Sequence, residues 1–293
     1  MSSLNFVALG MGQRITRAFA VGLVTYAVLI LGADRSPLMA QDAGLRVNRM
    51  IGALEKNQPA LSSETWAFVD FEHSPLDLIT MRKNVQALLG NKTDGKPTLA
   101  PIVRIPAEGD ELVANRWMVK QALESGAMGI IVPKVESAAQ AMMLVQAMRL
   151  PQLRGAKYPE PRGLRGVGGG SGLEWGLKTR ADYRGAADLW PLNPAGELVA
   201  LPQVESIAGL ENVREILAVP GVTGVFIGPN DFAQAHGLLD PEHPDVQAGI
   251  KRVADACVAA KKHCGILATK PDVEQRYLKA GFTIIVRTLY ALQ

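Results

Sequence analysis

Polar and ionisable residues stand directly after several short apolar runs of this 293-residue chain. In the stretch "GVFIGPND" the chain turns at Gly228 and Pro229 and then presents Asp231. A strand that is apolar on both faces belongs in a parallel sheet covered by helices, and such sheets carry their chemistry at the carboxyl ends of the strands. The other residues in such positions are Asp70, Glu72, His73, Arg104, Pro133, Lys134, Gln203 and Glu205.

Two of these carboxylates, Glu205 and Asp231, close consecutive predicted strands. Neighbouring strands lie about 4.8 Å apart, so two carboxylates there repel each other unless they are protonated or bridged by a cation. A hard divalent ion with oxygen ligands meets that need. Gln203, two residues before Glu205, points the same way along the strand. The alternative for Asp231 is that it caps the helix that follows.

A cation and an imidazole complete the predicted cluster. Arg104 is permanently charged and could stabilise an oxyanion that faces the metal. His73, close to Asp70, could act as a carboxylate-oriented general acid or base. The alternative is a structural salt-bridge network in which Arg104 pairs with Glu72 or Glu205.

The elements that must position these residues alternate along the chain. Strands are predicted at 58–63, 66–72, 98–105, 128–134, 198–205, 222–229, 264–269 and 283–288. Helical patterns at 110–126, 137–150, 209–221, 244–262 and 271–281 begin at Pro, Ser or acidic residues or end at Gly. Strands that alternate with helices indicate a parallel sheet, and eight strands favour a (β/α)₈ TIM barrel over an open doubly wound sheet.

Bulk composition excludes several other classes of protein. The net charge of +3 is small, and no basic run interleaves with aromatic residues, so we expect no nucleic-acid partner. The four histidines show no paired spacing that would indicate a histidine-rich metal site. Cys257 and Cys264 are too few for a disulfide framework and are interpreted as two buried small side chains.

Residues 1–40 differ from the rest of the chain. Arg14 and Arg17 precede the charge-free stretch 18–33, and Ala33 and Ala40 are possible cleavage positions. This order is typical of a secretory signal peptide, and the stretch is short for a membrane span. We therefore predict an exported protein, periplasmic or secreted, with a membrane anchor as one alternative and a cytoplasmic protein as another. Membrane contact is expected only if this segment is uncleaved. Residues 41–293 form the catalytic domain, with a long loop excursion at 151–197.

The chain resembles the HpcH/HpaI aldolase and citrate lyase family, and within it the metal-dependent 2-oxo acid aldolases. The resemblance rests on "FVDFEHSPLD", "PIVRIP", "GAMGIIVPKVESAAQA", "GLRGVGGG", "PQVESIAGLENVREILAVPGVTGVFIGPNDFAQAHG" and "GILATKPDVEQRYLKAGF". These segments follow the family in order from about residue 46 to residue 290.

The resemblance implies a TIM barrel that binds Mg²⁺, Mn²⁺ or Co²⁺ and assembles as a homo-oligomer. It implies cleavage of a 4-hydroxy-2-oxo acid to pyruvate or a related 2-oxo acid plus an aldehyde. Glu205 and Asp231 would be the metal ligands, and Arg104 would hold the 2-oxo oxygen and the enolate. His73, oriented by Asp70, would transfer protons. The backbone at Gly228 and Pro229 would line the 2-oxo acid pocket together with Gln203.

The chain also departs from the family pattern. The segment between Asn57 and Trp66 is short for a first strand plus a first helix, so the first βα unit is expected to be thin. No final helix follows the last predicted strand. Two alternative functions therefore stay open. One is an acyl-CoA lyase of the citrate lyase β type, and the other is an exported, catalytically impaired barrel that binds a carboxylate.

Overall fold

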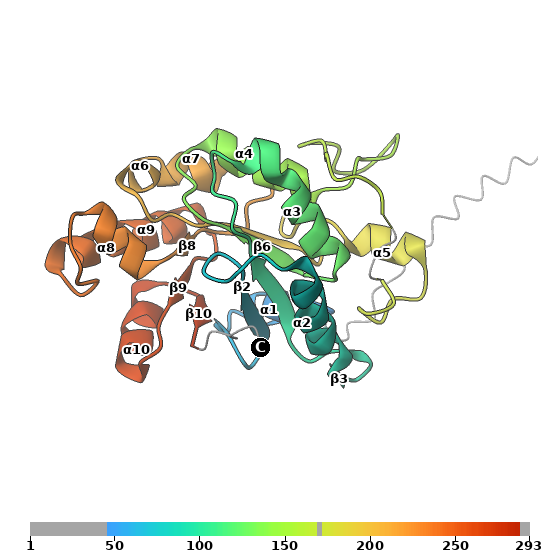
Figure 1. Cartoon of the computed structure of the whole chain (residues 1–293), viewed down its shortest axis with the longest axis horizontal. Coiled ribbons are helices and arrows are strands. Elements are labelled where there is room, and N and C mark those ends of the chain that lie inside the picture. Colours follow the sequence, from blue (N-terminus) through green and yellow to red (C-terminus); the bar gives the residue numbers. More distant parts are fainter. Residues whose placement is uncertain (1–45, 169–171, 288–293) are drawn as a thin grey trace, which may run out of the picture. The chain divides into compact units, whose positions relative to one another are not determined.

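The computed structural model describes residues 46–168 and 172–287 of the chain. The predicted signal peptide or anchor at 1–40 lies outside the described residues, and so does the segment after the last strand where no helix was expected. Figure 1 shows the helices arranged around a central set of strands.

Eight parallel strands follow one another in the order in which they occur along the chain. They are β1 (Ala60–Leu61), β2 (Trp66–Asp70), β5 (Ala100–Arg104), β6 (Gly129–Val132), β7 (Val199–Pro202), β8 (Phe226–Ile227), β9 (Gly265–Leu267) and β10 (Ile284–Val286). Hydrogen bonds join β2, β5, β6 and β7 in one sheet and β8, β9, β10 and β1 in another. Single parallel bridges link the sheets at both seams, Ser62 to Trp66 and Gln203 to Phe226. The predicted (β/α)₈ architecture is confirmed.

Helix α1 precedes the first strand, and the other helices lie between later strands and cover the outside of the sheets (Figure 1). They are α1 (Arg49–Leu54), α2 (Leu78–Gly90), α3 (Leu112–Glu124), α4 (Ala138–Met148), α5 (Arg180–Ala186), α6 (Ile207–Glu211), α7 (Val213–Ala218), α8 (Pro229–Ala235), α9 (Pro244–Ala260) and α10 (Pro271–Ala280). Local residues fix several helix starts. Asp77 accepts hydrogen bonds from the first turn of α2, and Ser137 forms a capping box with Gln140 at α4.

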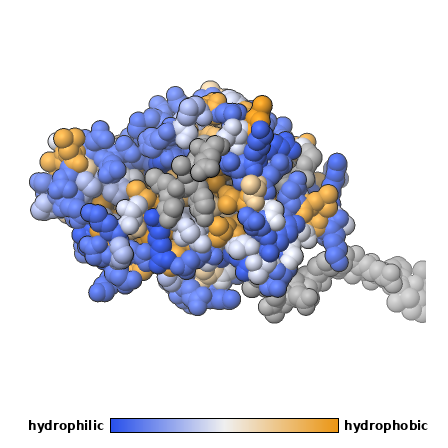
Figure 2. All heavy atoms as spheres, turned by 60° about the horizontal axis from the view of Figure 1, so that its bottom comes forward, coloured by the Kyte–Doolittle hydropathy of each residue, from blue (hydrophilic) through white to orange (hydrophobic). Residues whose placement is uncertain are grey.

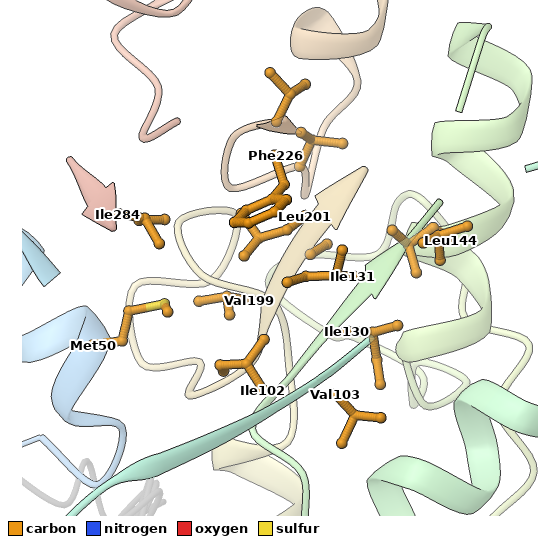
Figure 3. Packing of buried hydrophobic residues seen from close by; sticks show 14 of the residues in the cluster. Met50, Ile102, Val103, Ile130, Ile131, Leu144, Val199, Leu201, Phe226 and Ile284 are labelled. Carbon is orange, nitrogen blue, oxygen red and sulfur yellow. The ribbon is translucent and has the colours of Figure 1, made fainter. Parts of the chain in front are cut away.

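The strands are buried on both faces because alternate side chains enter two different layers. In β5, Ile102 points into the barrel and Val103 points toward the helices, and in β6 the neighbours Ile131 and Ile130 divide in the same way (Figure 3). This alternation follows from the pleat of a strand. It explains why the sequence shows continuous apolar runs in place of an apolar–polar alternation.

The first βα unit is as thin as the sequence indicated. β1 has two residues, and no helix separates it from β2 among the described residues. Its start, Ala60, pairs with Ile284 of β10. Helix α1 precedes β1, and its cap Asn48 also donates to the carbonyls of Met128 and Glu197. The N-terminal end of the described chain is therefore tied to the barrel by buried hydrogen bonds.

Two features were not predicted. A short antiparallel hairpin joins β3 (Lys92–Thr93) and β4 (Lys96–Pro97), and its turn residues Asp94 and Gly95 both have positive φ. Asp-Gly suits such a turn, but the polar strands gave no apolar signal. The second feature is a disulfide between Cys257 and Cys264, whose Cα atoms lie 6.1 Å apart. Both cysteines are buried, as expected, but they are bonded to each other.

The face of the molecule in Figure 2 is mostly hydrophilic, with apolar residues in separate patches. No helix within residues 46–168 and 172–287 has both the length and the apolar character needed to cross a membrane.

Candidate active site

The carboxyl ends of three strands of one sheet, β2, β5 and β7, bring polar side chains together. Asp70 ends β2 and Arg104 ends β5, and the two residues are direct partners in the strand register. Gln203 and Glu205 follow β7, which is joined to β5 through β6. Residues that are 34 to 135 positions apart in sequence therefore meet because parallel strands end at one edge.

Arg104 is the centre of this group. Its Nε and Nη2 atoms donate to Oδ1 and Oδ2 of Asp70 at 2.9 and 2.5 Å. Its Nη1 atom lies 2.6 Å from Glu72 Oε2 and donates to Gln203 Oε1 at 3.5 Å. The guanidinium carbon stands 5.1 Å from the centre of the Phe68 ring. Because the residue is only 6% exposed and its side chain is held on several sides, its positive charge has a fixed position.

Glu205 is the most strongly perturbed acid of the group. It is 2% exposed, its Oε1 accepts from the Lys134 amide at 2.9 Å, and its Oε2 accepts from the Gln203 side chain. Burial raises the pKa of Glu205 to about 7, and the negative charges of Glu72 and Asp231 act in the same direction. The hydrogen bonds from Gln203 and Lys134 oppose that rise in pKa. Near neutral pH, a cation that binds to this carboxyl can therefore displace its proton.

Asp231 lies in the first turn of α8 and does not cap it. The N-cap position belongs to Gly228, where no side chain bonds to the helix amides. A methyl group at the Cβ position of Gly228 would lie 2.7 Å from Glu205 Oε2 and 3.5 Å from Asp231 Oδ2. Both carboxylates therefore lie close to the space where a side chain at position 228 would begin, and only glycine leaves that space free. The alternative in which Asp231 is a cap is wrong.

Glu72 belongs to the same cluster, although the sequence indicated it only as a possible partner of Arg104. Its Oε2 is buried and makes no hydrogen bond of good geometry, in spite of the close ion pair with Arg104. Burial raises the pKa of Glu72, Asp70 and Asp231 add to that rise, and Arg104 and His73 oppose it. The signal in the sequence was its position two residues after Asp70, on the same face of an extended chain.

His73 stands at the exposed side of the cluster, with 60% of its side chain accessible. Its Nε2 lies 3.6 Å from Glu72 Oε2, while both carboxylate oxygens of Asp70 bind Arg104. The carboxylate nearest His73 is therefore Glu72, in place of the expected Asp70. The reason is the register: Asp70 faces its strand partner Arg104, and His73 lies beyond the strand end.

A pocket of about 110 Å³ opens beside the cluster. It is lined by Phe68, His73, Arg104, Phe226, Gly228, Pro229, Asn230, Asp231 and Leu267. The lining thus combines polar groups with the apolar side chains of Phe68, Phe226, Pro229 and Leu267, and the volume suits a ligand of a few heavy atoms. Gln203 was expected in this lining but is completely buried, and it instead holds the Glu205 carboxylate.

Few side chains of the site could serve as ligands of a divalent ion. The described part of the chain contains no group of three or more His, Cys, Asp or Glu side chains arranged to hold a metal. The candidate is the pair Glu205 and Asp231, which converge at Gly228. Hard oxygen donors and mutually repelling acids fit an Mg²⁺-like ion that keeps most of its coordination sphere for water or substrate oxygens. The Lys134 ammonium forms an ion pair with Glu108, which agrees with a structural role.

Comparisons with known proteins agree with the resemblance seen in the sequence. A family model described as HpcH/HpaI aldolase/citrate lyase matches residues 57–288. The hydroxypyruvate/pyruvate aldolase of Roseobacter denitrificans is 39% identical over 221 residues, which cover 74% of this chain and 74% of that protein. The 2-keto-3-deoxy-L-rhamnonate aldolase of Klebsiella pneumoniae is 35% identical over 227 residues, with 77% and 74% covered.

A solved structure supports the same fold. The crystal structure of a family protein from Burkholderia cenocepacia J2315 superposes with a TM-score of 0.67 at 29% identity. The superposition covers 83% of this chain and 93% of that one.

Proposed function

The chain belongs to the HpcH/HpaI aldolase/citrate lyase family and is a carbon–carbon lyase of the metal-dependent aldolase class, and we propose that it cleaves 4-hydroxy-2-oxo acids. The products would be pyruvate or a related 2-oxo acid and an aldehyde. The observation that carries this proposal is the convergence of Glu205 and Asp231 at Gly228, beside a pocket that also contains Arg104. The two relatives, by their names a hydroxypyruvate/pyruvate aldolase and a 2-keto-3-deoxy-L-rhamnonate aldolase, support the substrate class.

The fixed charge of Arg104 would stabilise the developing oxyanion. Its donors are held in place by Asp70, so little reorganisation is needed when negative charge builds up in the pocket. In the proposed reaction a 2-oxo acid would lie in the small pocket, against the backbone at Gly228 and Pro229. Holding the reacting carbons at this position contributes to the rate by orientation.

His73 is the candidate for proton transfer. Its ring is accessible from the pocket and lies near Glu72, so it can exchange a proton with the substrate hydroxyl directly or through one water. Asp70 acts indirectly, because it positions Arg104.

Glu205 and Asp231 would hold the divalent cation, Mg²⁺, Mn²⁺ or Co²⁺. When bound, such an ion supplies Lewis-acid stabilisation of an enolate. The buried Gln203 orients Glu205 for this task, in the way that outer hydrogen bonds orient metal ligands generally.

Two alternatives predict different results. An acyl-CoA lyase of the citrate lyase β type would turn over a malyl or citramalyl thioester, but the relatives described above are named as aldolases. An impaired carboxylate-binding barrel would bind pyruvate without exchanging the protons of its methyl group.

We further propose export from the cytoplasm and assembly into a homo-oligomer. The charge-free stretch at 18–33 supports export, and the Cys257–Cys264 disulfide agrees with an oxidising compartment. An uncleaved anchor and a cytoplasmic protein are distinguished by cell fractionation and N-terminal sequencing. Sedimentation equilibrium measures the assembly state.

The deciding experiment is deuterium exchange at the pyruvate methyl group with Mg²⁺, Mn²⁺ or Co²⁺, because it needs no knowledge of the aldehyde. We expect exchange with metal, loss of exchange with a chelator, and loss in Glu205→Ala. The matched control is Glu215→Ala, an exposed acid on α7. Undiminished exchange in chelator-treated protein would exclude the proposed mechanism.

A further inference from the structure

A second and larger hollow lies within the excursion between α4 and β7. Its volume is about 510 Å³, against about 110 Å³ for the active-site pocket. The lining residues are 150–158, Ala181, Arg184, Gly185, Ala187, Asp188 and Asn193. This volume lies within the range of small-molecule binding sites.

The excursion contacts the opposite face of the barrel from the active site. It leaves α4 and enters β7 at its amino end, and two of its hydrogen bonds are with residues that precede strands. The Trp175 indole donates to the Gly126 carbonyl at 2.9 Å, just before β6. The Thr223 hydroxyl, just before β8, donates to the Trp190 carbonyl at 2.7 Å. A ligand in this hollow would therefore be remote from the strand ends that carry Glu205.

The hollow has an excess of positive charge. Arg154, Lys157 and Arg184 line it, and none of them makes an ion pair within the described part of the chain. The one carboxylate in the lining, Asp188, is already bound by Arg149, with Nε to Oδ1 at 2.7 Å and Nη2 to Oδ2 at 3.1 Å. An anion in the hollow would thus meet cations whose charge no other side chain neutralises.

A smaller hollow of about 170 Å³ shares Leu150 and Arg184 with the first. Arg165 lines it and is only 4% exposed. Its Nη2 donates to the Ala187 carbonyl at 3.2 Å, but its Nε has no hydrogen-bond partner. Glu124 and Tyr183 also line this hollow and already interact with Arg165, so only its Nε donor is left for a bound anion to satisfy.

We propose that these adjoining hollows bind a small organic anion that has an apolar body and a phosphate or carboxylate group. The paired N–H donors of an arginine guanidinium match the spacing of the oxygen atoms in both groups. The side chains of Leu150, Leu153 and Ala181 offer apolar contacts for the body of the ligand. This site is separate from the active site, so the inference does not depend on the proposed reaction.

The test uses the full chain with phenyl phosphate and benzoate as probes, in calorimetric titrations at fixed ionic strength. The variant Arg154→Gln/Lys157→Gln/Arg184→Gln removes three charges from the hollow. Its matched control, Arg214→Gln/Arg252→Gln/Lys279→Gln, removes three exposed charges elsewhere. We expect binding of at least one probe, about tenfold or more weaker in the first variant and within about twofold of the parent in the control. The tighter probe identifies the anionic group.

Three results would overturn the proposal: neither probe binds, the hollow variant binds as tightly as the parent, or both variants weaken binding equally. Melting temperatures show whether each variant folds. If the triple variant does not fold, the single variants Arg154→Gln and Lys157→Gln carry the test, because both side chains are exposed. Each is then expected to weaken binding about threefold or more, and unchanged binding in both would equally exclude the site.

Discussion

Asp70 and Arg104 are direct partners in the register of β2 and β5, and both carboxylate oxygens of Asp70 accept hydrogen bonds from the guanidinium. This two-point contact at the strand ends fixes the orientation of a buried positive charge at the mouth of the active site. The pairing also leaves Glu72, and not Asp70, as the carboxylate nearest His73. The first prediction tests this division of roles.

Replacement Asp70→Asn keeps the shape of the side chain but removes its charge. We expect kcat to fall about tenfold to a hundredfold, because Arg104 loses a charge-assisted contact and its fixed orientation. The free energy of unfolding should fall by about 1–3 kcal/mol. Steady-state kinetics and denaturant titration measure the two effects. The control is Asp255→Asn, which loses only the exposed Lys251 pair and should change neither quantity appreciably.

Gly228→Ala tests the convergence of the two proposed metal ligands. The added methyl group would lie 2.7 Å from Glu205 Oε2 and 3.1 Å from Gln203 Nε2, so the carboxylate must move. We expect affinity for Mn²⁺ to fall about tenfold or more, because displaced ligands and their supporting hydrogen bonds weaken metal sites to this extent. Gly90→Ala, whose methyl group meets nothing within 4 Å, is the control. Equal Mn²⁺ affinity in both variants would contradict the site.

The raised pKa of Glu205 predicts a pH dependence with a definite sign. A carboxyl with pKa about 7 is protonated at lower pH, so a cation must displace the proton. Mn²⁺ affinity should therefore rise by up to about tenfold per pH unit as the pH approaches 7, and then level off. Titrations at several pH values measure it, and Glu205→Gln should abolish the trend together with most of the affinity.

The same shift in pKa affects the metal-free protein. The folded state binds the Glu205 proton more tightly than the unfolded state, whose ordinary pKa is 4.5. The contribution of this group to the free energy of unfolding therefore decreases as the pH rises from about 4.5 to about 7. Comparison of the parent with Glu205→Gln in urea isolates the contribution. A difference that does not change over this pH range would show that the carboxyl is not perturbed.

The sequence predicted the eight strands because strands buried on both faces leave apolar runs that are easy to recognise. The predicted lengths of the strands were less accurate. The predicted strand 222–229 is reduced to Phe226 and Ile227, since Thr223 bonds to Trp190 and Gly224 is packed against the His263 backbone. Such contacts come from distant segments and cannot be seen in a local pattern.

The candidate site could also be predicted in part. The resemblance and the strand ends together identified Glu205, Asp231 and Arg104, and the structure brings them together. The partner of His73 could not be predicted. Nearness in sequence suggested Asp70, but the strand register pairs Asp70 with Arg104. The basic hollow was also missed, since its cations come from residues 30 positions apart in an irregular segment.

The last prediction concerns the disulfide between Cys257 at the end of α9 and Cys264 just before β9. A cross-link across so short a segment restricts the unfolded chain and should stabilise the fold by about 2–3 kcal/mol. We expect the double variant Cys257→Ala/Cys264→Ala to lose about this amount in denaturant titration. Reductant should destabilise the parent under the same conditions and leave the variant unaffected. If reductant has no effect on the parent, and alkylation after unfolding modifies both thiols without reduction, the cysteines are free and the argument from the disulfide to an oxidising compartment fails.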